Sequence, residues 1–214
     1  MVVSPARVLS VNVGGVRTVD LDDRTITTAI WKSPVEGRVA VGGVNLSGDD
    51  QADRTVHGGV DKAVYAYAWE DTLWWQDQLG RALEPGSFGE NLTTVGVDVT
   101  GAVIGERWAV GGAVLQVCQP RVPCATFAGF WGIPDLVKRF TARGAPGAYL
   151  RVHRSGEVAA GDAVTVVHRP AHGVTIGEVF RSATDESLLP RLLMAPELPE
   201  KVRAKAARRL AGTH

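Results

Sequence analysis

The feature of this sequence that most constrains its fold is a long series of short β-prone segments. From residue 7 to about residue 168, runs rich in valine, tyrosine and tryptophan alternate with glycine-containing turns. This spacing predicts a compact, barrel-like mixed sheet, so the expected fold class is mainly β, of the α+β type. Strands are predicted at residues 7–13, 25–31, 63–69, 107–112, 113–119, 149–154 and 163–169.

Two segments within this region have helical periodicity. The first starts near Glu70 and ends before Pro85, and the second opens at Pro134. The expected buried stripe of the first helix is mostly apolar and consists of Trp69, Leu73, Gln76, Leu79 and Leu83.

After residue 169, the spacing of apolar residues changes from the strand type to the helical type. Pro170 and Gly173 are typical of a linker, and three short helices are expected beyond them. The residues expected to cap or start these helices are Thr175 with Glu178, Thr184, and Pro199. We therefore expect a β-barrel domain at residues 1–169 and a three-helix extension at residues 172–214.

Composition narrows the class of protein. The chain has 214 residues, no net charge and 45% hydrophobic residues, which is typical of a folded globular protein and unlike one built mainly to bind nucleic acid. Pro5 and Arg7 interrupt the N-terminal stretch, so it lacks the apolar core of a signal peptide. The apolar run at 109–118 is about half the length needed to span a bilayer. The expectation is a soluble cytoplasmic protein with no nucleic-acid or membrane partner.

Both cysteines lie in the stretch QVCQPRVPCATF, residues 116–127. They could form a local disulfide, be two buried small side chains, or be one structural thiol beside one that acts as a ligand or nucleophile. A disulfide between Cys118 and Cys124 is disfavoured in a reducing compartment. Their spacing also matches neither a C-x-x-C redox motif nor a zinc-binding pair.

The two thiols differ in their sequence surroundings. Cys118 still belongs to the predicted strand, which favours a structural role. Pro120 and Pro123 stiffen the connection that follows, and Arg121 favours the thiolate form of Cys124. Cys124 is therefore the candidate metal ligand or nucleophile, with a buried small side chain as the alternative.

Other loops carry groups that suit an anionic ligand. In DRTVHGGVDKAVYAY, the Gly58 and Gly59 amides can converge on an anion, although a plain glycine turn would look the same. PGSFGENLTT offers amide and hydroxyl groups that could equally close turns. With the upstream segment IWKSPVEGRVAV, the candidate binding residues are Lys32, Arg38, Arg54, His57, Lys62, Asn91 and Thr93.

Several catalytic patterns are absent from the sequence. It contains no H-E-x-x-H, G-x-S-x-G, Walker or G-x-G-x-x-G motif, and its histidines are not paired at zinc-ligand spacing. Two cysteines cannot hold an ordinary iron–sulfur cluster, so redox chemistry would need electrons from another molecule. The basic face of the last predicted helix is expected to be solvated, with docking of an acidic partner as the alternative.

Four segments, in this order, resemble the motifs of the MOSC domain, the C-terminal domain type of molybdenum cofactor sulfurases. They are GDDQADRTVHGGVDKAVYAY, PGSFGENLTT, GAVLQVCQPRVPC and DLVKRFTARGAPGAYLRV. The chain is similar to the compact bacterial subfamily with a C-terminal three-helix extension, of the 6-N-hydroxylaminopurine resistance type. This resemblance covers essentially the whole chain and implies a β-barrel like the small barrel domain of pyruvate kinase.

The resemblance also implies a ligand and an activity. It implies a bound molybdenum cofactor, Mo-molybdopterin, with Cys124 as metal ligand and catalytic residue. The implied activity is reduction of N-hydroxylated bases and hydroxylamines, with an external reductase as electron donor. Pyridoxal phosphate binding is a family-level alternative, and a dimer is one option for the oligomeric state. The implied cofactor-binding residues are Lys32, Arg54, His57, Gly58, Gly59, Lys62, Asn91, Thr93 and Arg121.

Two other functions stay open at this point. Cys124 could carry a persulfide in a sulfur-carrier or cofactor-handling protein. The domain could also bind the cofactor without turnover.

Overall fold

The structure, a computed structural model, describes residues 5–21, 24–52, 58–133 and 135–212. Its strands are β1 (Arg7–Val13), β2 (Arg17–Leu21), β3 (Arg24–Thr28), β4 (Ser33–Pro34), β5 (Val39–Gly42), β6 (Asn45–Leu46), β7 (Val64–Ala68), β8 (Leu92–Val95), β9 (Arg107–Val110), β10 (Ala113–Pro120), β11 (Ala148–Arg154), β12 (Gly156–Val158) and β13 (Val164–His168). Its helices are α1 (Trp69–Leu79), α2 (Ala125–Trp131), α3 (Leu136–Arg143), α4 (Ile176–Arg181), α5 (Leu189–Leu192) and α6 (Glu200–Gly212), with short 3-10 helices η1 (Val60–Lys62) and η2 (Glu186–Leu188). Within these residues, no helix is both long and apolar enough to cross a membrane.

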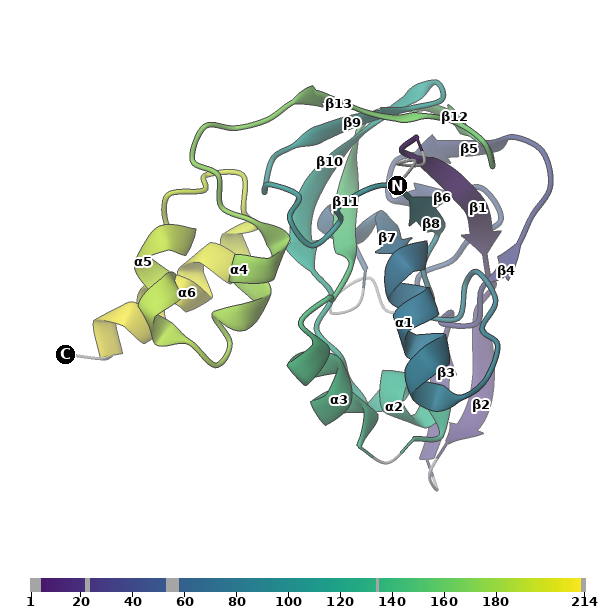
Figure 1. Cartoon of the computed structure of the whole chain (residues 1–214), viewed down its shortest axis with the longest axis horizontal. Coiled ribbons are helices and arrows are strands. Elements are labelled where there is room, and N and C mark those ends of the chain that lie inside the picture. Colours follow the sequence, from purple (N-terminus) through teal and green to yellow (C-terminus); the bar gives the residue numbers. More distant parts are fainter. Residues whose placement is uncertain (1–4, 22–23, 53–57, 134, 213–214) are drawn as a thin grey trace.

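Seven strands close into a barrel, in the order β13-β9-β10-β11-β7-β8-β1, and β4 pairs with the far end of β1 (Figure 1). The barrel closes where β1 meets the start of β13. There the Val8 amide donates to the Asp162 carbonyl at 2.9 Å and the Val164 amide donates to the Ala6 carbonyl at 2.9 Å. Neighbouring barrel strands are antiparallel except β7 and β8, which are parallel and joined through α1. The predicted mainly β, barrel-like fold is confirmed.

The molecule has two packed cores. The barrel interior is mainly aliphatic, with Trp108 as its large aromatic member. The second core is aromatic and includes side chains of α1, α2, α3 and β7. Within it, the ring centroids of Tyr67 and Phe88 are 4.3 Å apart, and those of Phe127 and Phe140 are 5.1 Å apart. This second core holds α2 in place, and with it the connection that carries Cys124.

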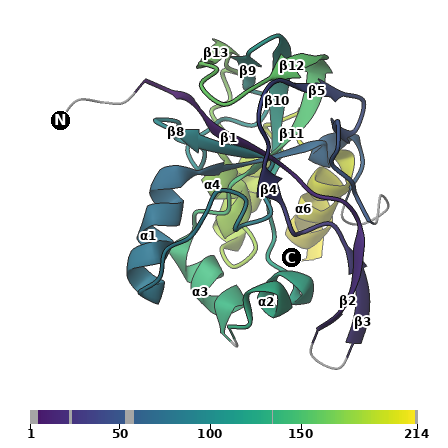
Figure 2. The same ribbon diagram turned by 90° about the vertical axis from the view of Figure 1, so that its right-hand side faces the viewer.

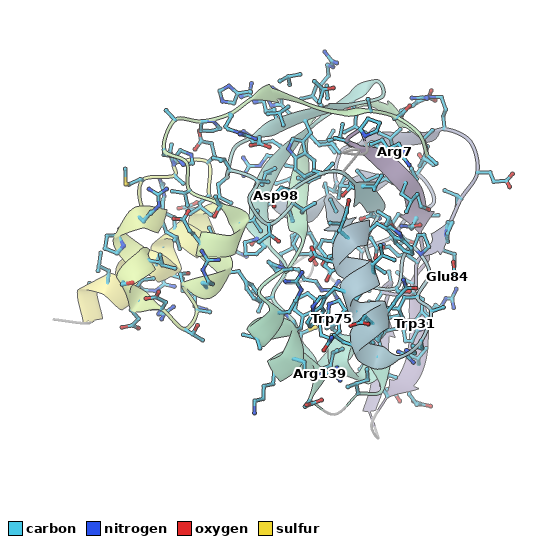
Figure 3. The ribbon with its side chains drawn as sticks, viewed as in Figure 1. Arg7, Trp31, Trp75, Glu84, Asp98 and Arg139 are labelled. Carbon is cyan, nitrogen blue, oxygen red and sulfur yellow. The ribbon has the colours of Figure 1, made fainter. Side chains whose placement is uncertain are left out.

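The buried face of α1 differs from the predicted stripe. Trp75 is fully buried and Thr72 nearly so, whereas Leu73 is 46% exposed. The Trp75 Nε1 donates to the Tyr67 hydroxyl at 3.1 Å, and Arg139 of α3 lies 5.7 Å from the centre of the Trp75 ring (Figure 3). Burying the larger indole and satisfying its N–H rotates the helix away from the leucine stripe.

Several short elements lie where no strand or helix is predicted, among them β2, β5, β6 and β12, and also β8 and α2. Residues 92–95, within a polar loop by prediction, form β8 between β7 and β1, and residues 125–131 form α2. Both are too short to give a clear periodic pattern. The cap at Thr184 is also wrong, because the Asp185 side chain accepts the Ser187 amide at 3.1 Å and begins η2 instead.

The C-terminal helices pack against their own barrel. The expected capping box of Thr175 and Glu178 opens α4. The Ile176 amide donates to the Ala102 carbonyl at 2.9 Å, and the side chains of Ile176 and Leu192 are part of the barrel core cluster. In Figure 1, α4, α5 and α6 form one group beside the barrel, apart from α2 and α3, and in Figure 2 the β2–β3 hairpin extends away from the barrel.

Candidate functional site

A pocket of about 390 Å³ lies between the end of the β2–β3 hairpin, residues 49–52, the start of β7 and the connection that follows β10. Thr93 and the Gly58–Gly59 pair are not part of its lining. Arg54 and His57 lie outside the described residues, so their predicted roles stay predictions. The structure brings five of the predicted site residues to this pocket: Lys32, Lys62, Asn91, Arg121 and Cys124.

Cys124 is the residue that begins α2. Its backbone is extended, with φ −130° and ψ 173°, and its carbonyl accepts the Ala128 amide at 3.0 Å. The side chain is partly buried against the aromatic core and lines the pocket. The position therefore combines a fixed backbone with an accessible thiol, which a ligand or nucleophile requires.

Cys118 is a structural thiol by contrast. It is fully buried in β10, its thiol donates to the Gln116 carbonyl at 3.3 Å, and its sulfur accepts from Arg151 Nε at 3.0 Å. Burial raises its pKa to about 11 despite the nearby guanidinium. Both cysteines are free, so the disfavoured disulfide is not formed.

Arg121 is a buried cation in the wall of the pocket. The residue is 7% exposed, and its Nη1 donates to the Phe88 carbonyl at 2.6 Å. Its guanidinium carbon lies 4.5 Å from the ring centre of Phe127 and 5.1 Å from that of Tyr65. In the described part of the chain, no carboxylate forms an ion pair with it. A buried guanidinium without a counter-charge is an attractive site for an anion.

Lys32 is the second buried cation, and it differs from Arg121 in having a carboxylate partner. Its ammonium pairs closely with Asp49, and the two side chains are only 8% and 3% exposed. Asp49 also accepts from the Gly14 amide at 2.9 Å and from Asn91 Nδ2 at 2.9 Å. Burial lowers the pKa of Lys32, although Asp49 opposes this shift.

Asn91 and Thr93 lie at different depths. Asn91 lines the pocket and also accepts the Tyr65 amide on Oδ1 at 3.0 Å, which ties the loop before β8 to β7. Thr93 is fully buried, donates to Glu90 at 2.8 Å and accepts from Asn12 Nδ2 at 3.0 Å. Thr93 therefore supports the site from beneath and does not face it.

Glu90 stabilises the loop PGSFGENLTT, residues 85–94, through hydrogen bonds to its backbone. Its carboxylate accepts the Gly86 amide at 2.7 Å and the Phe88 amide at 2.9 Å. Burial raises its pKa. Gly86 has φ 90°, and a Cβ there would lie 2.6 Å from the Lys32 carbonyl, so glycine is required at this contact. The loop thereby presents the Phe88 carbonyl to Arg121.

The glycine pair lies at the entrance to β7. The Gly59 amide donates to Gln51 Oε1 at 2.9 Å and its carbonyl accepts the Lys62 amide at 3.0 Å, which starts η1. Lys62 lines the pocket, with its ammonium 5.7 Å from the ring centre of Tyr149. Arg38 is not at this site, because it pairs with Asp162 at 3.1 Å on another part of the surface.

Among the residues of the pocket wall that the sequence did not predict, Asp49, Tyr65 and Tyr149 are the ones with polar or aromatic side chains that bear on its chemistry. Asp49 sits in the polar run GDD, where nothing indicates which carboxylate folds inward. Tyr65 and Tyr149 belong to predicted strands, and their rings lie 5.0 Å apart in the wall of the pocket. The described residues contain no cluster of three or more histidine, cysteine and carboxylate side chains suited to a metal ion.

Comparisons with known proteins agree with this architecture. The MOSC domain model matches residues 53–165. The chain is 35% identical over 201 residues to the uncharacterized protein YflK of Bacillus subtilis (strain 168), which spans 92% of this chain and 91% of that protein. It is 30% identical over 172 residues to a protein named "Reductase" from Gibberella moniliformis (strain M3125 / FGSC 7600), which spans 78% of this chain and 30% of that protein.

A solved structure gives the same result for the fold. The crystal structure of YiiM from Geobacillus stearothermophilus superposes with a TM-score of 0.80 at 30% identity, over 96% of this chain and 100% of that chain. The sequence match spans more than half of the chain, and the structural match spans nearly all of it. The chain therefore belongs to the MOSC domain family.

Proposed function

We propose that this protein is an oxidoreductase that holds a molybdenum cofactor through Cys124 and reduces N-hydroxylated compounds. The observation that carries the proposal is the meeting, in one pocket, of an accessible thiol and Arg121, a buried cation without a carboxylate partner in the described chain. Membership of the MOSC domain family supports the cofactor, and the similarity to a fungal protein named "Reductase" supports the reaction class.

The residues of the pocket fit this cofactor chemically. A thiolate is a soft ligand that suits a thiophilic metal. Arg121 and Lys62 would bind the anionic and carbonyl oxygens of the cofactor, since charge-assisted hydrogen bonds to such groups are strong. The rings of Tyr65 and Tyr149 would pack against its planar part or against a planar substrate. Bound there, the cofactor would supply two-electron redox chemistry.

The proposed reaction has a defined balance. A compound R–NHOH takes up two electrons and two protons, the N–O bond breaks, and R–NH₂ and water leave. Because two cysteines cannot hold an iron–sulfur cluster, we expect the electrons to come from a separate donor protein. Hydroxylamines, amidoximes and N-hydroxylated bases such as 6-hydroxylaminopurine are the substrate candidates.

The alternative is a sulfur carrier with a persulfide on Cys124. The partial exposure of this thiol in the pocket suits that role as well, because an acceptor could reach it. Mass spectrometry separates the two functions. A sulfur adduct of about 32 Da on Cys124 that leaves when an acceptor is added would favour the carrier.

Turnover is the test of the reductase. Protein from a host that makes the cofactor is assayed with an artificial electron donor against the three candidate substrate classes, and Cys124→Ser serves as the matched inactive variant. The expected result is reduction of at least one class by wild type and none by Cys124→Ser. Wild-type protein with a full molybdenum content that reduces none of them would refute the reductase.

A further inference from the structure

The two buried cations of the pocket have different electrostatic surroundings. Arg121 has no carboxylate partner in the described chain, whereas the charge of Lys32 is balanced by Asp49 in the same buried space. A neutral ion pair attracts an anion far less than an unpaired guanidinium does. Lys32 is therefore poorly suited to binding an anionic ligand, the role for which the sequence makes it a candidate, and another role explains its position in the pocket better.

The hydrogen bonds assign the exchangeable proton within this pair. Both carboxylate oxygens of Asp49 already accept: Oδ1 from the Gly14 amide and Lys32, and Oδ2 from Asn91. All three of these groups donate to Asp49, so within the ion pair Lys32 is the donor and Asp49 the acceptor. Lys32 is thus the member of the pair that carries a proton into the pocket.

We propose that Lys32 is the proton donor to the hydroxyl oxygen of the N-hydroxylated substrate when the N–O bond breaks. This inference rests on the proposed reductase function. Two electrons arrive from the external donor protein, the N–O bond cleaves, and the Lys32 proton is transferred to the departing oxygen, which leaves as water. A second proton, from solvent, completes the amine, and a further solvent proton restores the ammonium.

The two tyrosine hydroxyls of the pocket are less suited to this step. The Tyr65 hydroxyl donates to the Pro146 carbonyl at 2.8 Å, and burial raises the pKa of Tyr65 and of Tyr149. Burial and the charge of Arg121 lower the pKa of Lys32, while Asp49 and Glu90 act in the opposite direction. A lowered lysine pKa improves its match to an acid working near neutral pH.

The experiment compares Lys32→Met and Lys32→Arg with wild type, each loaded with cofactor. Arginine keeps the charge and the pairing with Asp49 but does not give up its proton. The expected result for both variants is wild-type molybdenum content with kcat lower by about 100-fold or more. The decline of wild-type kcat with rising pH should vanish in Lys32→Arg. Lys138→Arg, an exposed change on α3, is the matched control.

A second readout does not depend on turnover. In cofactor-free protein labelled with [ε-¹³C]lysine, the signal absent from Lys32→Arg should titrate at lower pH than those of the exposed lysines. Wild-type kcat in Lys32→Arg, or a Lys32 signal that titrates with the exposed lysines, would overturn the inference. Loss of molybdenum from both variants would show that Lys32 binds the cofactor, and this would also overturn the inference. An inactive wild type would instead refute the proposed reductase.

Discussion

The two cysteines are six residues apart in the sequence and lie in opposite surroundings. Cys118 is fully buried and bonded to Arg151, yet burial holds its pKa at about 11. Arg151 is also paired with Asp61 at 2.8 Å, so its charge is already balanced. Arg121, near Cys124, has no such partner in the described chain. An arginine beside a thiol therefore does not lower the thiol pKa below its usual value where the thiol is buried and the arginine is already paired.

The largest expected effect is a difference in thiol reactivity. In folded, cofactor-free protein, iodoacetamide should modify Cys124 at least about 100-fold faster than Cys118, because Cys118 is fully buried and burial raises its pKa to about 11, whereas Cys124 lines the pocket. Peptide mass spectrometry over a time course measures both rates. Denatured protein, in which the two rates should converge, is the control. Equal modification rates of Cys124 and Cys118 in the folded protein would contradict the claim that the two thiols lie in different surroundings.

Arg121, for which the described residues provide no ion-pair partner, gives the second prediction. Arg121→Met should lower the molybdenum content or cofactor affinity by about 10- to 100-fold, the value of one or two charge-assisted hydrogen bonds. Arg38→Met removes a cation that is paired with Asp162 away from the pocket and should leave cofactor binding unchanged. Similar cofactor retention by the two variants would show that the missing counter-charge of Arg121 does not matter.

The smallest effect concerns the stability that Cys118 contributes at different pH values. Its pKa is raised in the folded protein, so this contribution is fully present below about pH 9 and is lost as the pH rises through about 11. Between pH 8 and pH 10.5, wild type should lose about 2 kcal/mol more than Cys118→Ala. Urea unfolding at pH 8 and pH 10.5 tests this, since the buried tyrosines are common to both proteins. Identical losses in both would contradict the raised pKa.

Much of the fold follows from the sequence because the barrel strands are long enough to show their pattern. The predictions at 7–13, 113–119 and 149–154 overlap β1, β10 and β11 closely. The sequence could not reveal β8 or α2, since these short elements depend on tertiary partners on both sides. The rotation of α1 toward Trp75 likewise depends on an aromatic core assembled from distant segments.

The sequence predicted those site residues whose role depends on their own chemistry and on a backbone that nearby prolines make rigid. Arg121 and Cys124 follow from the Pro-flanked connection, and the structure places both in the pocket. The pairing of Lys32 with Asp49 was not predictable, because it joins segments whose proximity only the folded chain creates. The same holds for Arg151, which reaches Cys118 from the neighbouring strand.

The central claim is that Cys124, and not Cys118, is the metal ligand. The most direct test is elemental analysis of molybdenum in wild type, Cys124→Ala and Cys118→Ala, all purified from a host that makes the cofactor. The account predicts molybdenum near one per chain in wild type and Cys118→Ala, and its loss in Cys124→Ala. Full molybdenum in Cys124→Ala, or none in any of the three under conditions that load a known molybdoenzyme, would contradict it.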